Sequence, residues 1–566
     1  MEPKTQSFPV KNIRSQAVSS ASLLLSGLAL LVPVLVYGLV FSRYAINVPK
    51  FDDHALKAFL LKLDQAESLR DQIYEFFAQH NEHRIFYDRL ISWLDYHLTG
   101  KLNFVHLMLV GNLSLVLLLL VFIRALRQAG VSLWMALPVS LLLFNLSHWE
   151  NTFWGMAALQ NFTVVALAVA TFYELSFKNR VGWLAIALAV LATLTSGNGL
   201  LIWPVGLILI FLRQDYVGVL RWLLALAITF RLYFLDYQKP AGNPPDPGSL
   251  LAQLHGWLLF NGAAAEAFPV RNFLLTCLLL GGIIIALAAF FGIPAVVEKF
   301  RGIKLTEWQL FFLGGAAFTI GTGLVVAFNR VGFGLGTLTT SRYKIYSLTL
   351  LAFLFTYGIV RTNPSKRFLT AGLATVFSFL IAFFSYSTFL DEAVYLRQFM
   401  STYQFNFTFT KNSTQPAIDP VTRQYVQNAP AFYDEHLAEL LTSIRPADPI
   451  KIDSVFKSGT IFTVIQSTIS PFGLRDEGSY LLARSAQRTY LFPVKQNLSR
   501  SPRGWFWPQR IFSGGFIAEI PETDLARGNY GLFVLTVESG NSVKLHPTGR
   551  TITASGVKYQ RPESNW

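Results

Sequence analysis

Residues 21–41 read ASLLLSGLALLVPVLVYGLVF, a run without a single charged side chain. An α-helix rises about 1.5 Å per residue, so roughly 20 apolar residues are needed to cross the hydrocarbon core of a bilayer. Basic residues precede the run and no small-x-small cleavage site follows it, which favours an uncleaved membrane span over a signal peptide. The stretch therefore predicts an integral membrane protein.

Ten further apolar segments extend this prediction to a polytopic α-helical membrane protein with about 11 transmembrane helices. They are Phe104–Ile123, Val131–Leu146, Met156–Tyr173, Val181–Thr195, Leu200–Leu212, Val217–Leu235, Phe273–Phe291, Trp308–Phe328, Ile345–Val360 and Phe368–Phe384. The fifth and sixth spans are the shortest, and only Ser196-Gly197-Asn198-Gly199 separates them. We expect them to form a tight helical hairpin that stops short of the far face.

Composition supports the membrane assignment and excludes other classes. Hydrophobic residues make up 52% of the 566 residues and charged residues 14%, against about 25% charged in soluble domains. The net charge of +14 arises largely from Lys and Arg beside apolar segments, a pattern that sets topology and does not indicate nucleic-acid binding. The single cysteine, Cys277, excludes an internal disulfide and a cysteine-rich metal site.

The distribution of cations predicts orientation, because cytoplasmic loops are enriched in Lys and Arg. A cytoplasmic N-terminus puts the following residues inside: Lys4, Lys11, Arg14, Arg124, Arg127, Lys178, Arg180, Arg213, Arg221, Lys299, Arg301, Lys304, Arg361, Lys366 and Arg367. The connections after spans three and five then lie outside and carry neither Lys nor Arg. Eleven spans leave the C-terminus outside.

Two regions are expected on the outer side. Residues 42–103 follow the first span and contain apolar-periodic stretches that predict amphipathic helices on the membrane surface. Residues 391–566 form a C-terminal extracytoplasmic domain after the transmembrane domain of residues 1–390. From about residue 451 this domain is β-rich, and short strands with regular turns predict a β-sandwich: Thr460–Ile465, Tyr480–Leu482, Thr489–Val494, Gly515–Ile520, Tyr530–Val537 and Ser542–Leu545.

Polar residues concentrate in the predicted outer connections. Asp52 and Asp53 follow the first span, where paired carboxylates could coordinate a cation or supply a base, or could be an ordinary solvated pair. His80, Glu82, His83 and Arg84 form the densest cluster, which lacks the H-E-x-x-H spacing of zinc proteases and could also be an exposed polar turn.

Further candidates lie in shorter connections. Glu150 and Asn151 join spans three and four, where they could face a cavity or simply bond between helices. Arg330 and the run Ser341-Arg342-Tyr343-Lys344 flank a glycine-rich loop. Arginine presents a planar fork that matches phosphate, so these cations favour an anionic ligand over the alternative that they only reach lipid headgroups.

The acidic pair, the first outer loop with its amphipathic helices, the N-in, C-out layout and the closing β domain together resemble the GT-C superfamily of membrane glycosyltransferases. Three stretches look like those of bacterial members: Trp149–Gly155 (WENTFWG), Ser196–Leu200 (SGNGL) and Ser341-Arg342-Tyr343. The sequence lacks the WWD-type motif of oligosaccharyltransferases, which argues against a protein acceptor.

The resemblance implies inverting transfer of a sugar from a polyprenyl-phosphate carrier to a glycan or lipid acceptor, at the outer face of a bacterial inner membrane. Asp53, or in second place Asp52, would be the catalytic base, and Arg342 with Lys344 or Arg330 would stabilise the leaving phosphate. His80, Glu82, His83, Arg84, Glu150, Asn151, Asn198 and Tyr343 would complete the substrate site. No cofactor is required, although a divalent metal could sit at Asp52 and Asp53.

Two other functional classes stay open. A glycolipid transporter or flippase would bind a similar lipid without chemistry, and it predicts essential polar groups near mid-membrane. A non-enzymatic membrane assembly protein would use the β domain to bind partners, and it would make the loop carboxylates dispensable.

Overall fold

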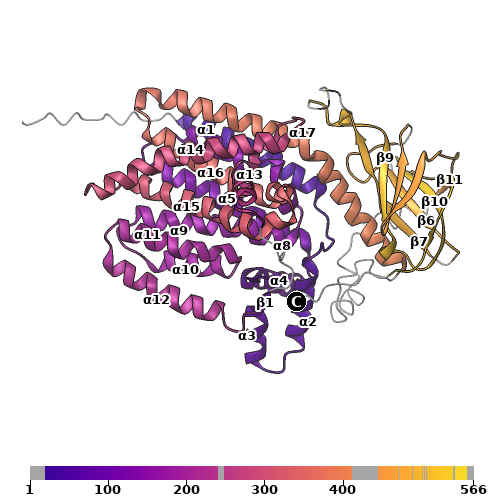
Figure 1. Ribbon diagram of the computed structural model, residues 1–566, viewed down its shortest axis with the longest axis horizontal. Coiled ribbons are helices and arrows are strands. Elements are labelled where there is room, and N and C mark those ends of the chain that lie inside the picture. The colour runs from indigo at the N-terminus through magenta and orange to yellow at the C-terminus, as the bar shows by residue number, and fades with distance from the viewer. Residues whose placement is uncertain are drawn as a thin grey trace, which may run out of the picture.

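A bundle of apolar helices and a β domain make up the structure, a computed structural model (Figure 1). It describes residues 20–239, 248–410 and 444–557, apart from short gaps at 469–470, 487, 500, 502–503, 505 and 539–541. The N-terminal cations Lys4, Lys11 and Arg14 lie outside the described residues. The described part shows a mostly helical, multi-pass arrangement followed by β-sheets.

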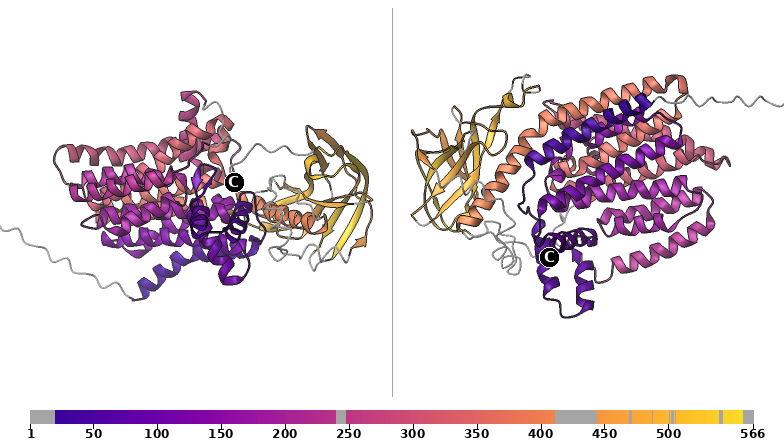
Figure 2. Two further views of the ribbon diagram at one scale, coloured as in Figure 1. Left: turned by 90° about the horizontal axis from the view of Figure 1, so that it is seen from below. Right: turned by 180° about the vertical axis from the view of Figure 1, so that it is seen from behind.

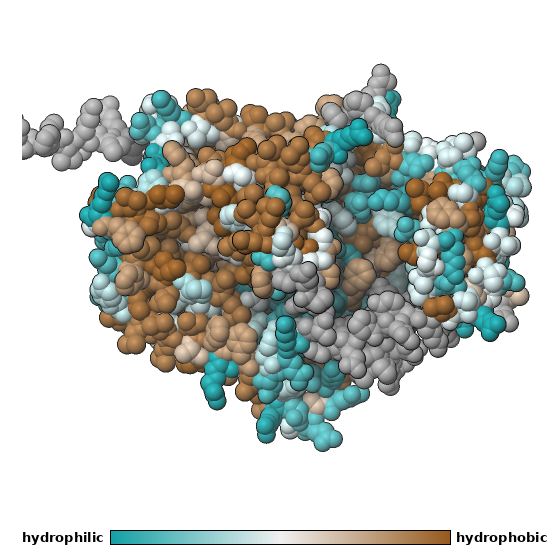
Figure 3. All heavy atoms as spheres, in the orientation of Figure 1, coloured by the Kyte–Doolittle hydropathy of each residue, from teal (hydrophilic) through white to brown (hydrophobic). Residues whose placement is uncertain are grey.

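Eight helices in the described residues are long and apolar enough to cross a membrane. Seven of them are α1 (Ser20–Tyr44), α5 (Phe104–Gln128), α12 (Tyr216–Tyr233), α14 (Phe273–Phe300), α15 (Glu307–Arg330), α16 (Lys344–Arg361) and α17 (Pro364–Thr410). The eighth is built from α8 (Gly155–Ala157), the π-helical turn η3 (Ala158–Phe162) and α9 (Thr163–Phe177). Their surface is largely hydrophobic (Figure 3), as expected for a lipid-facing belt.

The remaining three predicted spans are short. The fifth and sixth correspond to α10 (Trp183–Thr193) and to η4 (Gly197–Leu201) followed by α11 (Ile202–Leu212). The two α-helices have 11 residues each, about 16 Å at the helical rise, so both segments are short apolar helices. That they stop short of the far face stays a prediction. The third contains only η1 (Leu133–Ala136) and the seven-residue α6 (Leu137–Leu143). Eleven complete spans therefore stay a prediction.

The predicted surface loop forms a separate helical layer at one end of the bundle. It contains α2 (Asp53–Asp64), α3 (Leu69–Phe77) and α4 (Phe86–Thr99), with a hairpin of β1 (Gln79–His80) and β2 (His83–Arg84). The hairpin contacts the α10–η4 connection, where the Gly197 N–H donates to His83 Nδ1 at 3.0 Å. Connections that the charge pattern assigned to one side thus meet at one end of the bundle.

Helix α17 links the bundle to the β domain (Figure 2). It has 47 residues and continues without interruption past residue 390, where the sequence suggested a boundary. Its outer part is tied to both bodies. Arg397 donates to both carboxylate oxygens of Asp476, at 2.7 and 2.9 Å, and to the carbonyl of Ala45 at the end of α1. Asn406 exchanges two hydrogen bonds with the backbone of Leu491.

The β domain is a two-sheet sandwich, as predicted. One sheet has the order β3-β11-β10-β6-β7 and the other β4-β5-β9-β8. Side chains from both sheets, including Val464 and Ile520 of one and Leu481 and Val534 of the other, form one buried cluster. The strands are β3 (Arg445–Pro446), β4 (Ser454–Ser458), β5 (Ile461–Gln466), β6 (Gly478–Arg484), β7 (Thr489–Pro493), β8 (Lys495–Leu498), β9 (Phe512–Pro521), β10 (Gly528–Val537) and β11 (Val543–Ala554). Each of the six predicted runs overlaps an observed strand.

Glycine allows one close helix crossing that shapes the bundle. Helix α13 (Leu250–Asn261) packs on α14 so tightly that a Cβ at Gly281 would lie 1.9 Å from the carbonyl oxygen of Leu258. The next residue, Gly282, has no atom within 4 Å of the same position. Of these two neighbouring glycines of α14, Gly281 is therefore the one that the packing requires.

We expect Gly281→Ala to destabilise the protein and Gly282→Ala to leave it unchanged, because the first adds a methyl group against backbone that cannot rotate away. Overpacking of this kind costs about 1–3 kcal/mol. The midpoint of thermal unfolding of the two purified variants in detergent measures the difference. Equal midpoints would show that α13 and α14 are not in close contact.

Candidate functional site

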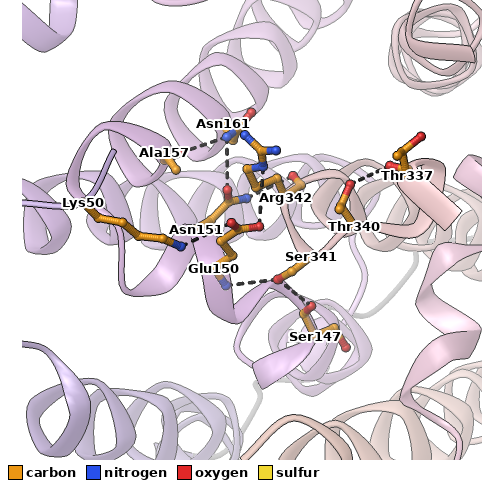
Figure 4. Close-up of polar contacts among 10 residues, drawn as sticks. All are labelled: Lys50, Ser147, Glu150, Asn151, Ala157, Asn161, Thr337, Thr340, Ser341 and Arg342. Carbon is orange, nitrogen blue, oxygen red and sulfur yellow. Dashed lines mark hydrogen bonds and ion pairs between the residues drawn. The ribbon is translucent and has the colours of Figure 1, made fainter. Parts of the chain in front are cut away.

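A cluster of polar side chains joins three distant chain segments at the end of the bundle that carries the surface loop (Figure 4). The carboxylate of Glu150 lies 3.2 Å from Lys50 Nζ and 3.5 Å from Arg342 Nε. Lys50 precedes α2, Glu150 belongs to the short helix α7 (Trp149–Thr152), and Arg342 belongs to η8 (Ser341–Tyr343). We call Lys50, Glu150 and Arg342 the charged triad.

Neutral hydrogen bonds hold the triad in place. The Glu150 N–H donates to Ser341 Oγ at 3.0 Å, and that hydroxyl donates to the carbonyl of Ser147. The Asn151 amide donates to the carbonyl of Arg342 at 3.1 Å and accepts from Asn161 Nδ2 at 3.0 Å. The turn at 147–151 and the segment 341–342 are therefore locked together.

The two cations of the triad differ in exposure. The Lys50 side chain is 5% exposed, whereas that of Arg342 is 40% exposed. Both lie over the ring of Trp154, at 4.8 and 5.4 Å from its centroid, where the ring face attracts positive charge. Burial lowers the pKa of Lys50, and the neighbouring Glu150 carboxylate opposes this. Arg342 is the member that an external ligand can reach.

The predicted acidic pair separates into a buried and a half-exposed carboxylate. Asp53 is fully buried, and its two oxygens accept from the backbone N–H groups of Met156 and Lys50, at 2.8 and 3.0 Å. Glycine at position 155 favours this approach, because a Cβ there would lie 3.1 Å from Asp53 Oδ1, which is a tight contact. Burial raises the pKa of Asp53 to about 7. Asp52, one residue earlier, is only partly buried.

The structure reveals a third carboxylate, Asp88 of α4, which is fully buried. In the described part of the chain no hydrogen bond of ordinary geometry reaches its oxygens, although the Gln160 amide faces it. Burial raises the pKa of Asp88 well above its usual value, and Asp53 adds to this by charge repulsion. The sequence carried a signal, since Asp88, Ser92 and Asp95 recur at helical spacing and all lie on the buried face of α4.

A cavity of about 520 Å³ opens beside the triad. Its floor is the turn between α10 and α11, at Ser196–Leu201, and its walls come from α15 and the start of α16. Val325 and Val326 make one wall apolar, and Glu82 and His83 of the surface hairpin lie at its polar end. The turn that joins the two short helices therefore forms part of the cavity lining.

Cations outnumber acids around this cavity. Arg330 bonds to Glu82 at 3.1 Å, while Lys239 lines the cavity with no acidic partner among the described residues. The Asn198 amide donates to Tyr346 at 2.7 Å on the opposite side. The lining is thus mostly apolar, with amide, hydroxyl and cationic groups, which suits an amphipathic anion.

The predicted site residues other than the acidic pair fall into three groups. The cavity is lined by Glu82, His83, Asn198, Arg330 and Tyr343. The polar cluster beside it contains Glu150, Asn151 and Arg342, and Asn161 connects the two because it lines the cavity and bonds to Asn151. Asp52, Asp53 and Arg342 themselves are not among the cavity-lining residues.

The third group consists of residues whose side chains are buried or bonded within the fold and do not line the cavity. His80 is buried in the hairpin, and Arg84 donates to the carbonyls of Phe77, Tyr233 and Leu235, which ties the hairpin to α12. Lys344 is 2% exposed and pairs with Glu266 at 2.9 Å. These contacts suit a role in holding the fold.

A divalent metal at Asp52 and Asp53 stays a prediction. Both oxygens of Asp53 already accept backbone N–H groups, and no group of three or more potential ligands occurs in the described residues. No mechanistic step is therefore assigned to a metal.

No family model, no curated protein and no solved structure matches this chain.

We expect Asp88→Asn to stabilise the protein increasingly as pH rises. A carboxyl whose pKa is raised on folding contributes most to the free energy of unfolding when the pH is below its unfolded pKa of about 3.9. This contribution to stability is lost as the pH rises toward the folded pKa. Asparagine cannot ionise and escapes that loss. The thermal midpoint of Asp88→Asn should match that of wild type at pH 4 and exceed it at pH 8. The exposed Asp64→Asn in the same loop is the control, and parallel behaviour of the two variants would contradict the assignment.

Proposed function

We propose that the chain is a GT-C-type glycosyltransferase that transfers a sugar, with inversion, from a polyprenyl-phosphate carrier to a glycan or lipid acceptor at the outer face of the membrane. The observation that carries the proposal is the cavity beside the charged triad, which has an apolar wall and a cationic, hydroxyl-rich end within one membrane bundle. A lipid phosphate has the same division between an apolar chain and an anionic head.

The donor is proposed to lie along α15 and α16. Its isoprenoid would contact the apolar wall at Val325 and Val326, and its phosphate would meet Arg330 and Lys239 at the mouth. Arg342, half-exposed next to the cavity residue Tyr343, would complete the anion site. A guanidinium offers paired donors to phosphate oxygens, which stabilises the charge that develops on the leaving group.

The acceptor is proposed to be activated by Asp52. The acceptor oxygen attacks the anomeric carbon, its proton passes to the carboxylate, and the bond from that carbon to the phosphate oxygen breaks with the electron pair leaving on phosphate. Asp53 is too enclosed to receive a substrate proton directly. Its backbone bonds to Lys50 and Met156 make it a positioning residue for Asp52 and for the triad.

A glycolipid transporter remains the second candidate, because of the ion pair of Lys344 and Glu266 buried inside the bundle. Intramembrane charges commonly mark transport pathways. A transporter would move labelled glycolipid across reconstituted vesicles without changing it, whereas a transferase would release free carrier phosphate.

We expect Asp52→Asn to lower the rate of sugar transfer by roughly 10²–10⁴-fold, as loss of a general base does. Asp53→Asn should lower both the rate and the thermal stability. The two oxygens of Asp53 each accept one backbone N–H, and asparagine has only one acceptor oxygen. Transfer from a radiolabelled lipid-linked sugar and the thermal midpoint are measured in parallel. Full activity of Asp52→Asn would remove it as the base.

We expect Arg342→Ala and Arg342→Lys both to weaken turnover, by roughly ten- to hundredfold for the loss of a charge-assisted bond worth about 1.5–3 kcal/mol. Lysine keeps the charge and loses the fork, so it should not rescue phosphate binding. Arg271→Ala, at an exposed position after η5 (Ala263–Ala267), is the control. Wild-type turnover in both Arg342 variants would exclude a phosphate contact.

A further inference from the structure

The connection between β8 and β9 exposes aromatic side chains that the β-sandwich does not use. Phe506 is 66% exposed and Trp507 is 59% exposed. Leu498, at the end of β8, is exposed as well. An apolar group of this kind on a water-soluble domain indicates a contact surface.

The same connection is packed against the membrane bundle. Its last residue, Ile511, and the first residue of β9, Phe512, belong to the buried cluster formed by the apolar helices and not to the sandwich core. Leu474, which precedes β6, packs against that cluster too. This edge of the β domain therefore lies on the bundle.

Phe506 meets the lipid-facing surface of α17 directly. Its ring centroid is 5.5 Å from that of Phe383, which falls inside a predicted span. Phe379 stacks on Phe383 from one turn earlier, and it is exposed, as is Val376 before it. The apolar surface of a membrane-crossing helix thus continues without a break onto the β domain.

Two arginines lie where the β domain meets the end of the neighbouring helix α1. Arg43 is exposed in the last turn of α1, and Arg475 of the β domain donates from Nε to its carbonyl oxygen at 3.0 Å. The side chain of Arg475 is itself 43% exposed. Arginine beside aromatic rings is typical of the zone where lipid headgroups meet hydrocarbon.

We propose that Phe506 and Trp507 are a membrane-interface anchor, inserted into the lipid leaflet on the side of the β domain. Phe506 extends the hydrocarbon-facing surface of α17, and the indole of Trp507 occupies the headgroup boundary, where its ring is apolar and its N–H can reach water. The partner is the lipid itself. The inference does not depend on the proposed glycosyl transfer.

A nitroxide spin label at position 507 tests the anchor in the full-length protein in lipid nanodiscs. The label is attached to Trp507→Cys in a Cys277→Ser background, which removes the natural cysteine. Collisions with oxygen, which concentrates in lipid, and with a water-soluble nickel complex are then compared. The matched control is Phe456→Cys, exposed on β4 at the opposite edge of the same sheet.

The expected result is an oxygen-to-nickel collision ratio severalfold higher at 507 than at 456. Equal ratios would place Trp507 in water and overturn the proposal. A label shielded from both reagents would mean that protein covers the surface, which overturns it as well. If Trp507→Cys fails to reach the thermal midpoint of the parent, the label is moved to Leu498→Cys, which must then give the lipid-like ratio.

Discussion

The carboxylate of Glu150 is the contact on which the polar end of the bundle depends. The carboxylate binds two cations from different segments, Lys50 and Arg342. The backbone N–H of Glu150 donates to the hydroxyl of Ser341. These segments belong to the entry into α2 and to the entry into α16, and α7 lies between them in space. Without this carboxylate, two cations would face each other over one tryptophan ring.

Charge balance lowers the cost of taking ionised groups partly out of water at this end of the bundle. Each described ion pair in this region combines a cation with an acid from a distant segment, as in Arg330 with Glu82 and Lys344 with Glu266. Burying a charge costs several kcal/mol unless a partner and hydrogen bonds offset it. A phosphate that reaches Arg342 must therefore compete with Glu150. Ligand binding and the attachment of η8 to α7 are consequently linked in free energy.

The sequence predicted features that depend on local pattern. Short β-rich runs separated by turns located the strands, and the Ser196–Gly199 turn between two brief apolar runs predicted the two short helices whose connection lines the cavity. The pairing of Lys50 with Glu150 could not be predicted, because it joins residues 100 positions apart. The sequence placed Arg342 and Lys344 at one anion site only because they are two positions apart in the chain. In a helix, residues two apart point about 200° from each other, so one side chain faces outward while the other turns into the bundle.

Helix α17 adds a mechanical property to this arrangement. Its 47 residues span about 70 Å as one hydrogen-bonded rod, with one end among the membrane helices and the other fixed to β7 through Asn406. Such a rod resists bending and twisting, so a rotation of the sandwich turns the last span with it. Arg397 of α17 is close to the point where such a rotation would be centred, because it binds both the carbonyl at the end of α1 and Asp476 of the β domain. Force applied to the β domain would thereby reach the lipid-embedded helices as torque.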